Sequence, residues 1–150
     1  MAQTTGAMSW ENAKVEIATD AAFTYGTDIS GSTNKVTTTG GEITSATVFT
    51  HGTLTPIIGY GAAGERTVEI GAVYSESDTE AYFLADDYYT NSDDVWVRVT
   101  PDGVAGTKRF KTSVGRILTP PQIEGEAGKP DFVVTSFTVS CSAITWEDIP

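Results

Sequence analysis

The sequence is poor in the residues that enzymes and metal sites use. It has one cysteine, Cys141, and one histidine, His51, which are 90 positions apart and so lack the close ligand spacing of a zinc site. A single cysteine also excludes a disulfide within the chain, and the alternation Val139, Cys141, Ala143 indicates a buried thiol. The sequence has no phosphate-binding glycine motif. We therefore expect no cofactor, no metal and no enzymatic activity.

Positive charge and long apolar runs are also scarce. Nine bases against twenty acids give a net charge of -11, which disfavours binding to nucleic acid or to anionic membranes, because neutralising phosphates requires Lys and Arg. No apolar run approaches the roughly 18 residues of a membrane span. The first twelve residues lack the basic and apolar regions of a secretory signal. We expect a chain that is made and assembled in the cytoplasm without binding membranes.

The charges are unevenly spread along the chain. Seven acids lie between Glu76 and Asp94 without a base, whereas five bases lie between Arg98 and Arg116 with a single acid. Two interpretations stay open: each zone is a solvated face, or the two zones are complementary patches on neighbouring subunits. In the second case Lys108 and Arg109 lie at a subunit interface.

Leucine is rare, with three copies, but β-branched residues are abundant: 24 Thr, 13 Val and 10 Ile. Such residues favour pleated sheets, so we expect a mainly β protein. Period-two alternation predicts strands over 13–18, 66–74, 95–100 and 107–118, and a bent or bulged run over 132–146. A weaker pattern predicts a strand over 42–50 and at most a short one at 35–38. The expected fold is one domain, residues 1–150, forming a β-sandwich or incomplete barrel.

One helix is predicted over residues 78–90. Ser77 and Glu80 have the spacing of a capping box, and Asp78 adds negative charge to the first turn. Apolar residues at helical spacing then form one face, which we expect to pack against the sheet: Ala81, Leu84, Ala85 and Tyr88.

Two segments outside these elements carry apolar anchors. Residues 1–12 predict a flexible N-terminal arm with Met8 and Trp10. Residues 51–65 form a long glycine-rich loop in this interpretation, with the apolar residues Leu54, Ile57, Ile58 and Tyr60. Either the loop folds back over its own core, or it docks on a neighbouring subunit. The second alternative makes these four residues, with Met8 and Trp10, interface residues.

The order of these elements resembles a known family. DISGSTNKV, GGEI, a TPII loop, a strand ending in VYSE, one acidic helix, VWVRVTPDG and a final strand closing in AITWE follow one another from about Lys14 to Glu147. This series resembles the major tail tube protein of long-tailed, non-contractile bacteriophages. The segments Asp28–Gly31 and Ala143–Trp146 are the nearest matches.

The resemblance implies a virion protein that forms hexameric rings, stacked into a tube for DNA ejection. The implied partners are further copies of the chain, the tape measure protein, and the tail-tip and tail terminator proteins, while DNA passes without specific binding. The inner wall of such tubes is a continuous β-barrel, and we expect Glu42, Thr44 and Glu69 to line its lumen. Alternatives are a tube or ring protein of a contractile tail or secretion system, and a capsid-decorating or carbohydrate-binding β-sandwich.

Overall fold

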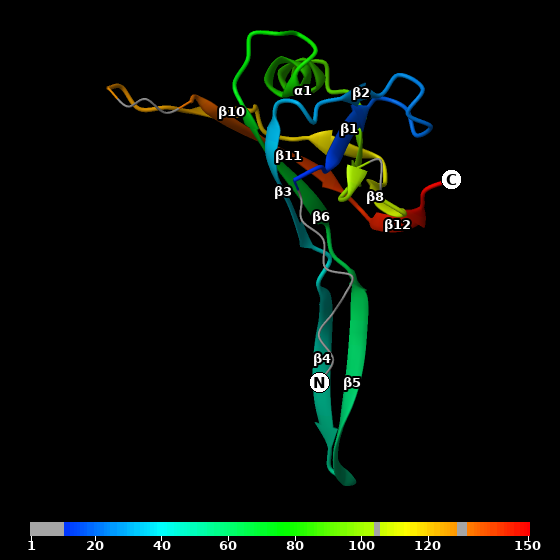
Figure 1. Cartoon of the computed structure of the whole chain (residues 1–150). Coiled ribbons are helices and arrows are strands. Elements are labelled where there is room, and N and C mark those ends of the chain that lie inside the picture. The colour runs from blue at the N-terminus through cyan, green and yellow to red at the C-terminus, as the bar shows by residue number, and fades with distance from the viewer. Residues whose placement is uncertain (1–10, 104–105, 129–131) are drawn as a thin grey trace, which may run out of the picture.

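The computed structural model describes residues 11–103, 106–128 and 132–150 (Figure 1). These ranges contain one helix, α1 (Ala81–Thr90). Their strands are β1 (Lys14–Ala18), β2 (Thr27–Asp28), β3 (Thr33–Gly40), β4 (Ile43–Thr50), β5 (Thr53–Ala63), β6 (Arg66–Val73), β7 (Trp96–Thr100), β8 (Lys108–Thr112), β9 (Gly115–Ile117), β10 (Gln122–Glu124), β11 (Val134–Cys141) and β12 (Ile144–Asp148).

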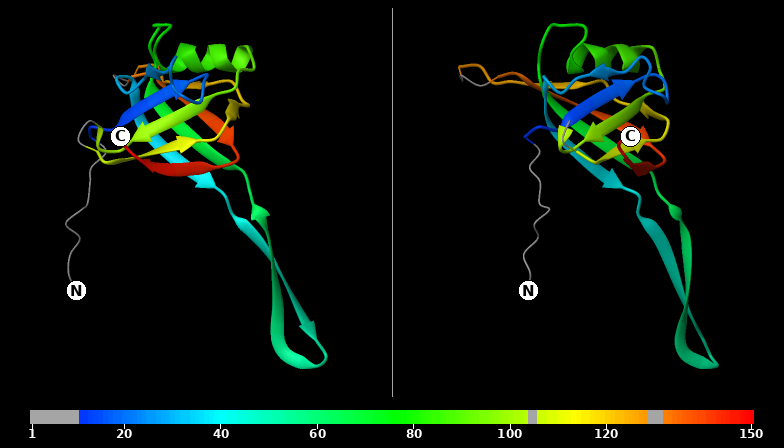
Figure 2. Two further views of the ribbon diagram at one scale, coloured as in Figure 1. Left: turned by 90° about the vertical axis from the view of Figure 1, so that its right-hand side faces the viewer. Right: turned by 45° about the vertical axis from the view of Figure 1, so that its right-hand side comes forward.

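Two antiparallel sheets face each other as a sandwich, which confirms the expected fold class (Figure 2). Sheet A has the order β12-β8-β7-β1-β2, and sheet B has the order β10-β11-β6-β3, with β9 also paired to β11. The core lies between the sheets, where inward side chains alternate with outward ones. Its fully buried members include Ile17, Val97 and Val99 from sheet A, and Val68, Ile70 and Val139 from sheet B. Each such burial contributes about 1.5–3 kcal/mol to folding.

The two sheets are joined at a corner where two chain segments change sheet. The predicted single strand 107–118 is wrong, because it breaks at Ser113 into β8 of sheet A and β9 of sheet B. The long run 132–146 breaks likewise at Ser142 into β11 and β12. The hydroxyl of Ser113 accepts hydrogen bonds from the backbone N–H groups of Ser142 and Ala143, at 3.2 and 3.1 Å. The break also reverses the exposure of the alternating positions, so Val114 is exposed and Ile117 is buried.

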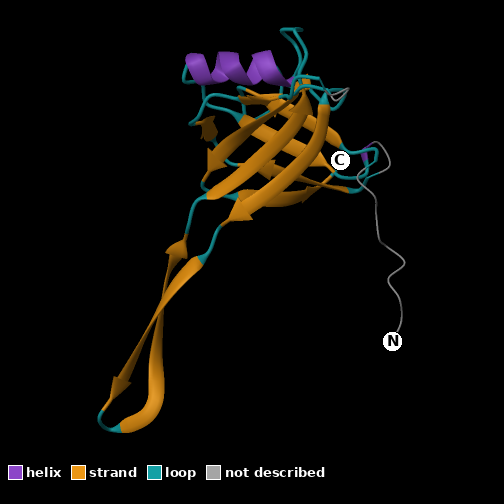
Figure 3. Cartoon of the chain, turned by 90° about the vertical axis from the view of Figure 1, so that its left-hand side faces the viewer, coloured by secondary structure: helices purple, strands orange, loops and turns teal. Residues whose placement is uncertain are grey.

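Helix α1 lies across one end of the sandwich (Figure 3). Ala81, Ala85 and Tyr88 are buried against the core, which confirms the predicted apolar face. The predicted start is wrong by three residues. Glu80 is the N-cap residue, without a side-chain capping bond, so the capping box predicted from Ser77 and Glu80 does not form.

A long two-stranded hairpin, formed by β4 and β5, extends from the opposite end of the sandwich (Figures 1 and 3). Two predictions are therefore wrong: residues 51–65 are largely strand rather than loop, and the short strand expected at 35–38 is the longer β3. The glycines and threonines of residues 51–65 interrupt the apolar alternation that predicts a strand. The backbone hydrogen bonds of a hairpin nevertheless form without apolar side chains. The hairpin continues strands β3 and β6 of sheet B.

Candidate assembly surfaces

The β4–β5 hairpin, residues 43–63, is apolar and uncovered. Val48 lies opposite Ile57, and Thr47 lies opposite Ile58, so both faces of the ribbon carry exposed apolar side chains. Leu54 is 94% exposed. An isolated two-stranded hairpin is marginally stable in water. Of the two interpretations given above, folding back over the core is therefore wrong, and docking on another subunit stays a prediction.

Two glycines lie at the root of the hairpin, where the chain leaves sheet B. Gly40 and Gly41 have φ angles of +87° and +80°, a conformation that other residues rarely adopt. The backbone N–H of Gly41 donates to the carbonyl of Glu65 at 2.9 Å, and that of Gly64 donates to the carbonyl of Glu42 at 2.9 Å. A Cβ atom at position 40 would lie 2.1 Å from the Glu65 carbonyl oxygen. The connection from β3 to β4 and the connection from β5 to β6 therefore pack backbone against backbone.

Sheet B presents a hydroxyl-rich outer face. Strand register places Thr37, Glu69 and Thr138 in one row across three strands. A neighbouring row consists of Thr39, Thr67 and Ser140. Between these rows, Val68 and Val139 point the other way into the core. These two rows are polar, as the surface of a water-filled channel would be.

The three residues predicted to line a lumen fall on two different parts of the molecule. Glu69 is exposed on the outer face of sheet B, in β6. Glu42 lies in the connection between β3 and β4, and Thr44 lies in β4 of the hairpin; both are exposed. Lys35 is exposed on the same side of sheet B as Glu69, one row away. The face is therefore rich in hydroxyls rather than strongly acidic.

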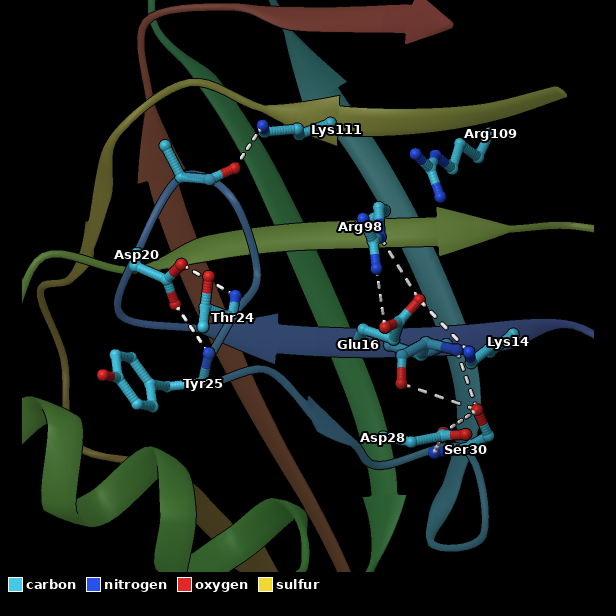
Figure 4. A network of polar contacts seen from close by, with 12 residues as sticks. Lys14, Glu16, Asp20, Thr24, Tyr25, Asp28, Ser30, Arg98, Arg109 and Lys111 are labelled. Atoms are coloured by element: carbon cyan, nitrogen blue, oxygen red, sulfur yellow. Dashed lines mark hydrogen bonds and ion pairs between the residues drawn. The ribbon is translucent and has the colours of Figure 1, made fainter. Parts of the chain in front are cut away.

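Sheet A has a charged outer face whose bases are paired within the subunit (Figure 4). Arg98 donates two hydrogen bonds to the Glu16 carboxylate, at 2.8 and 3.2 Å. Its guanidinium carbon also lies 4.3 Å from the ring centroid of Phe23, a cation–π contact. The Phe23 loop is fixed by Asp20, whose carboxylate accepts hydrogen bonds from the backbone N–H groups of Thr24 and Tyr25, at 2.8 and 3.0 Å. These bonds, that from Tyr25 above all, lower the pKa of Asp20.

The basic zone predicted from the sequence is largely neutralised by acids that are distant in the chain. Lys108 pairs with Asp148 at 2.6 Å, and Arg109 pairs with Glu147 at 2.7 Å, because β8 and β12 are neighbours. Arg116 pairs with Asp94 at 3.0 Å. Sequence reasoning missed these pairs since they depend on strand register. Lys108 and Arg109 are consecutive residues of β8, beside the edge strand β12, so their side chains leave the strand in opposite directions.

The remaining predicted interface residues, Met8 and Trp10, lie outside the described residues.

Cys141 is buried, as predicted, and burial raises the pKa of its thiol. Within the described ranges, His, Cys, Asp and Glu side chains form no group of three or more that would hold a metal ion. In the same ranges, α1 is too short to cross a membrane.

Sequence reasoning also missed an apolar surface beside β10 and β11. Ile123, Phe132, Val133 and Val134 are all exposed, with Phe132 at 79%. We call these four residues the β10–β11 patch, which spans both faces of the ribbon, because Ile123 lies opposite Thr135 whereas Val134 lies opposite Glu124. Three consecutive apolar residues after a stretch rich in glycine and proline were the available signal. The patch lies where β10 and the start of β11 extend beyond the body of the sandwich (Figure 1).

Comparison with solved structures finds the same fold in tail-like particles. A chain in the sheath–tube complex of PVC, an extracellular contractile injection system in the extended state, matches with a TM-score of 0.69 and 15% identity over 97% of this chain and 94% of that chain. A chain in the tube-terminating cap of the anti-feeding prophage matches with a TM-score of 0.66 and 11% identity, over 99% and 95%.

A chain in the tail of the empty gene transfer agent particle matches with a TM-score of 0.60 and 11% identity, over 96% of this chain and 100% of that chain. No protein-family model matches the sequence, and no curated protein matches it. At these identities the likeness is one of fold. The chain is thus a mainly β sandwich of the type found in tail and injection-system assemblies, with close to the same length as its structural neighbours.

Proposed function

We propose that this chain is a structural protein of a phage-like tail, which forms hexameric rings that stack into a tube for DNA ejection. The observation that carries the proposal is the full-length fold match to components of tail and injection-system particles. The gene transfer agent tail among them has C6 symmetry, which supports a sixfold ring. The partners follow from the resemblance in the sequence: the tape measure, tail-tip and tail terminator proteins. The resulting virion tail is assembled in the host cytoplasm.

The outer face of sheet B is our choice for the channel wall. Within the described ranges β3 is one edge strand of sheet B, and β10 and β9 lie beside β11 at the opposite edge. Pairing such edges around a ring removes them, since a closed barrel has no edge. The rows of hydroxyls around Glu69 would then face the channel. Hydroxyls without clustered bases offer DNA phosphates little to bind, so DNA slides past.

The β4–β5 hairpin is our choice for the main contact between layers. Its anchors, Leu54, Ile57, Ile58 and Tyr60, are exposed in the isolated subunit. Their burial against another copy supplies the hydrophobic free energy of assembly. Contacts between unlike surfaces generate closed rings laterally and open stacks axially.

Negative-stain electron microscopy of the concentrated protein, with sedimentation velocity in parallel, tests the proposal. We expect rings or hollow tubes with sixfold end views. A protein that stays monomeric at high concentration, also with a crowding agent, would overturn the structural-polymer function.

A tube or terminator subunit of a contractile system is an equally supported second candidate, because the matches include the sheath–tube complex and the sheath/tube terminator of a contractile injection system. Such a tube has a sheath around it, which a non-contractile tube lacks. Co-expression with the sheath gene of the same cluster distinguishes the two: decorated tubes indicate the contractile system, and bare tubes indicate the non-contractile one.

A further inference from the structure

We infer that Asp94 is a positioning residue of the channel wall, which holds Arg116 in an ion pair and so keeps this arginine from binding the phosphates of DNA in transit. The inference rests on the proposed function, in which the outer face of sheet B lines the channel. It adds to that function the residue that prevents the wall from retaining DNA. The observation behind it is one arginine–carboxylate pair beside the rows of hydroxyls.

Arg116 lies on the outer face of sheet B, in line with one of the hydroxyl rows described above. In β9 it is directly opposite Ser140 of β11, so the two side chains leave the sheet on the same side. The next residue of β9, Ile117, is directly opposite Val139, and both are buried, as alternation requires. Arg116 therefore projects from the face that we assign to the channel wall.

Arg116 is the one arginine of the chain on this face. All four arginines lie in the described ranges. Arg98 and Arg109 belong to strands of sheet A, and Arg66 precedes Thr67 in β6 and so points to the other side of sheet B. The planar guanidinium of arginine binds a phosphate through two parallel hydrogen bonds. An unpaired arginine at position 116 would therefore give the wall a phosphate-binding group.

Backbone pairing places Asp94 beside Arg116. Val95 and Gly115 exchange two backbone hydrogen bonds, at 2.8 and 3.0 Å. The residue before one member of an antiparallel bridge lies opposite the residue after the other, so Asp94 lies opposite Arg116. The Nε atom of Arg116 donates a hydrogen bond to Oδ1 of Asp94 at 3.0 Å. Gly115 permits the close approach of β9 to β11, since a Cβ atom there would lie 2.5 Å from the Ser140 carbonyl oxygen.

The ion pair is open to solvent. The side chains of Arg116 and Asp94 are 55% and 50% exposed, so a phosphate could reach the guanidinium if the carboxylate were absent. In the described part of the chain, Asp94 is the one acid that forms an ion pair with Arg116. The carboxylate of Glu65 instead accepts a hydrogen bond from Ser140. With Asp94 in place, a phosphate has to displace a group of like charge that the backbone holds beside the arginine.

Four variants test the inference in tubes that are assembled with a short fluorescent DNA duplex, washed and pelleted. Asp94→Asn removes the carboxylate charge and keeps the size of the side chain. Asp94→Glu keeps the carboxylate, and Asp94→Asn with Arg116→Gln removes both charges of the pair. Asp86→Asn, on α1, is the matched control with the same change of net charge away from sheet B. Circular dichroism checks the fold, and negative-stain microscopy checks the tubes.

We expect Asp94→Asn tubes to retain roughly tenfold more duplex than wild-type tubes at low salt, because every subunit then presents an unpaired arginine to the phosphates. The retained duplex should be released as the salt concentration rises. Wild-type, Asp94→Glu, Asp86→Asn and double-variant tubes should all retain little. A purely structural role of Asp94 would give neither this salt dependence nor the reversal by Arg116→Gln.

Asp94→Asn tubes that retain no more duplex than wild-type tubes would overturn the inference while leaving the proposed function in place. Equal retention by the double variant would also overturn it, since the bound DNA would then not need Arg116. So would an Asp94→Asn protein that forms no tubes while Asp86→Asn forms them, because the pair would then act in assembly. Wild-type protein that forms no tubes would overturn the proposed function together with the inference.

Discussion

Val48 lies directly opposite Ile57 across the hairpin, and both side chains remain more than half exposed, at 58% and 60%. A cross-strand apolar pair stabilises a sheet when it is shielded from water, and here nothing in the described part of the subunit shields it. In the proposed function the pair belongs to an assembly surface, and the core cluster of the described residues does not include it. This separation of folding from assembly leads to the first prediction.

Excision of the hairpin should abolish assembly without changing the stability of the subunit. Ile43 pairs with Ala63, so residues 44–62 can be replaced by an Asn-Gly turn that suits a two-residue hairpin. Both strands must be removed together, since deleting β5 alone would leave β4 unpaired. Because the hairpin contributes nothing to the core cluster, we expect a change in unfolding free energy of less than about 0.5 kcal/mol. Urea unfolding and sedimentation measure the two properties, and tubes formed by the shortened protein would contradict the prediction.

A positive charge at Glu69 should make the tube retain DNA. If the outer face of sheet B lines the channel, Glu69→Lys puts one lysine per subunit into it, and phosphate binding becomes favourable and salt-dependent. Asp86→Lys, on helix α1, is the control with the same change of charge. We expect nuclease-protected DNA in Glu69→Lys tubes and only nuclease-sensitive DNA on the control. Equal protection in both would show that Glu69 lies outside the channel.

Reversing Lys108 and Arg109 should weaken stacking more at low salt than at high salt. Screening by salt already suppresses exposed charge pairs, so the loss is largest where screening is weak. The reversal Lys108→Glu with Arg109→Glu also breaks the pairs with Asp148 and Glu147 within the subunit. Adding Asp148→Lys and Glu147→Arg restores pairing within the subunit but keeps the outward charges exchanged. We expect this fourfold variant to be stable but still defective in stacking. Full recovery of stacking would show that Lys108 and Arg109 act only within the subunit.

Gly40→Ala should destabilise the hairpin root. At a φ of +87°, with the Glu65 carbonyl oxygen 2.1 Å from the new Cβ, alanine forces the two connections apart. We expect a loss of more than about 1 kcal/mol in unfolding free energy, together with shorter tubes. Gly31→Ala is the matched control, because a Cβ there meets nothing within 4 Å. Equal stability of the two variants would show that the hairpin root accommodates a Cβ atom at position 40 without loss of unfolding free energy.

The sequence patterns predicted those elements whose side chains alternate between core and solvent. Strands β1, β6 and β7 and the buried face of α1 follow from the regular placement of Val, Ile and Ala. Of the hairpin, β4 was predicted as the strand over 42–50, but β5 was missed, because its residues are exposed on both faces and carry no alternation to detect. The bend expected in 132–146 occurs at Ser142, but the change of sheet at Ser113 and Ser142 was missed, since a hydroxyl that bonds to a distant backbone leaves no local pattern. The ion pairs between β8 and β12 were missed because they depend on which residues of these two strands lie opposite each other. The strands are distant in the sequence, so no local pattern indicates that pairing.

Acid should remove the stabilising effect of Asp20, and this gives the last prediction. The backbone N–H groups of Tyr25 and Thr24 favour the ionised carboxylate and hold the pKa of Asp20 below its ordinary value. A carboxyl group with a lowered pKa in the folded state stabilises the fold above the unfolded pKa, near 3.9, and ceases to do so as the pH falls through the folded pKa. Asp20→Asn should therefore be less stable than wild type at pH 7, and the two should converge below about pH 4. Urea unfolding across this range measures the difference, and a gap that stays constant with pH would show that the carboxylate charge has no part in holding the loop that carries Phe23 under Arg98.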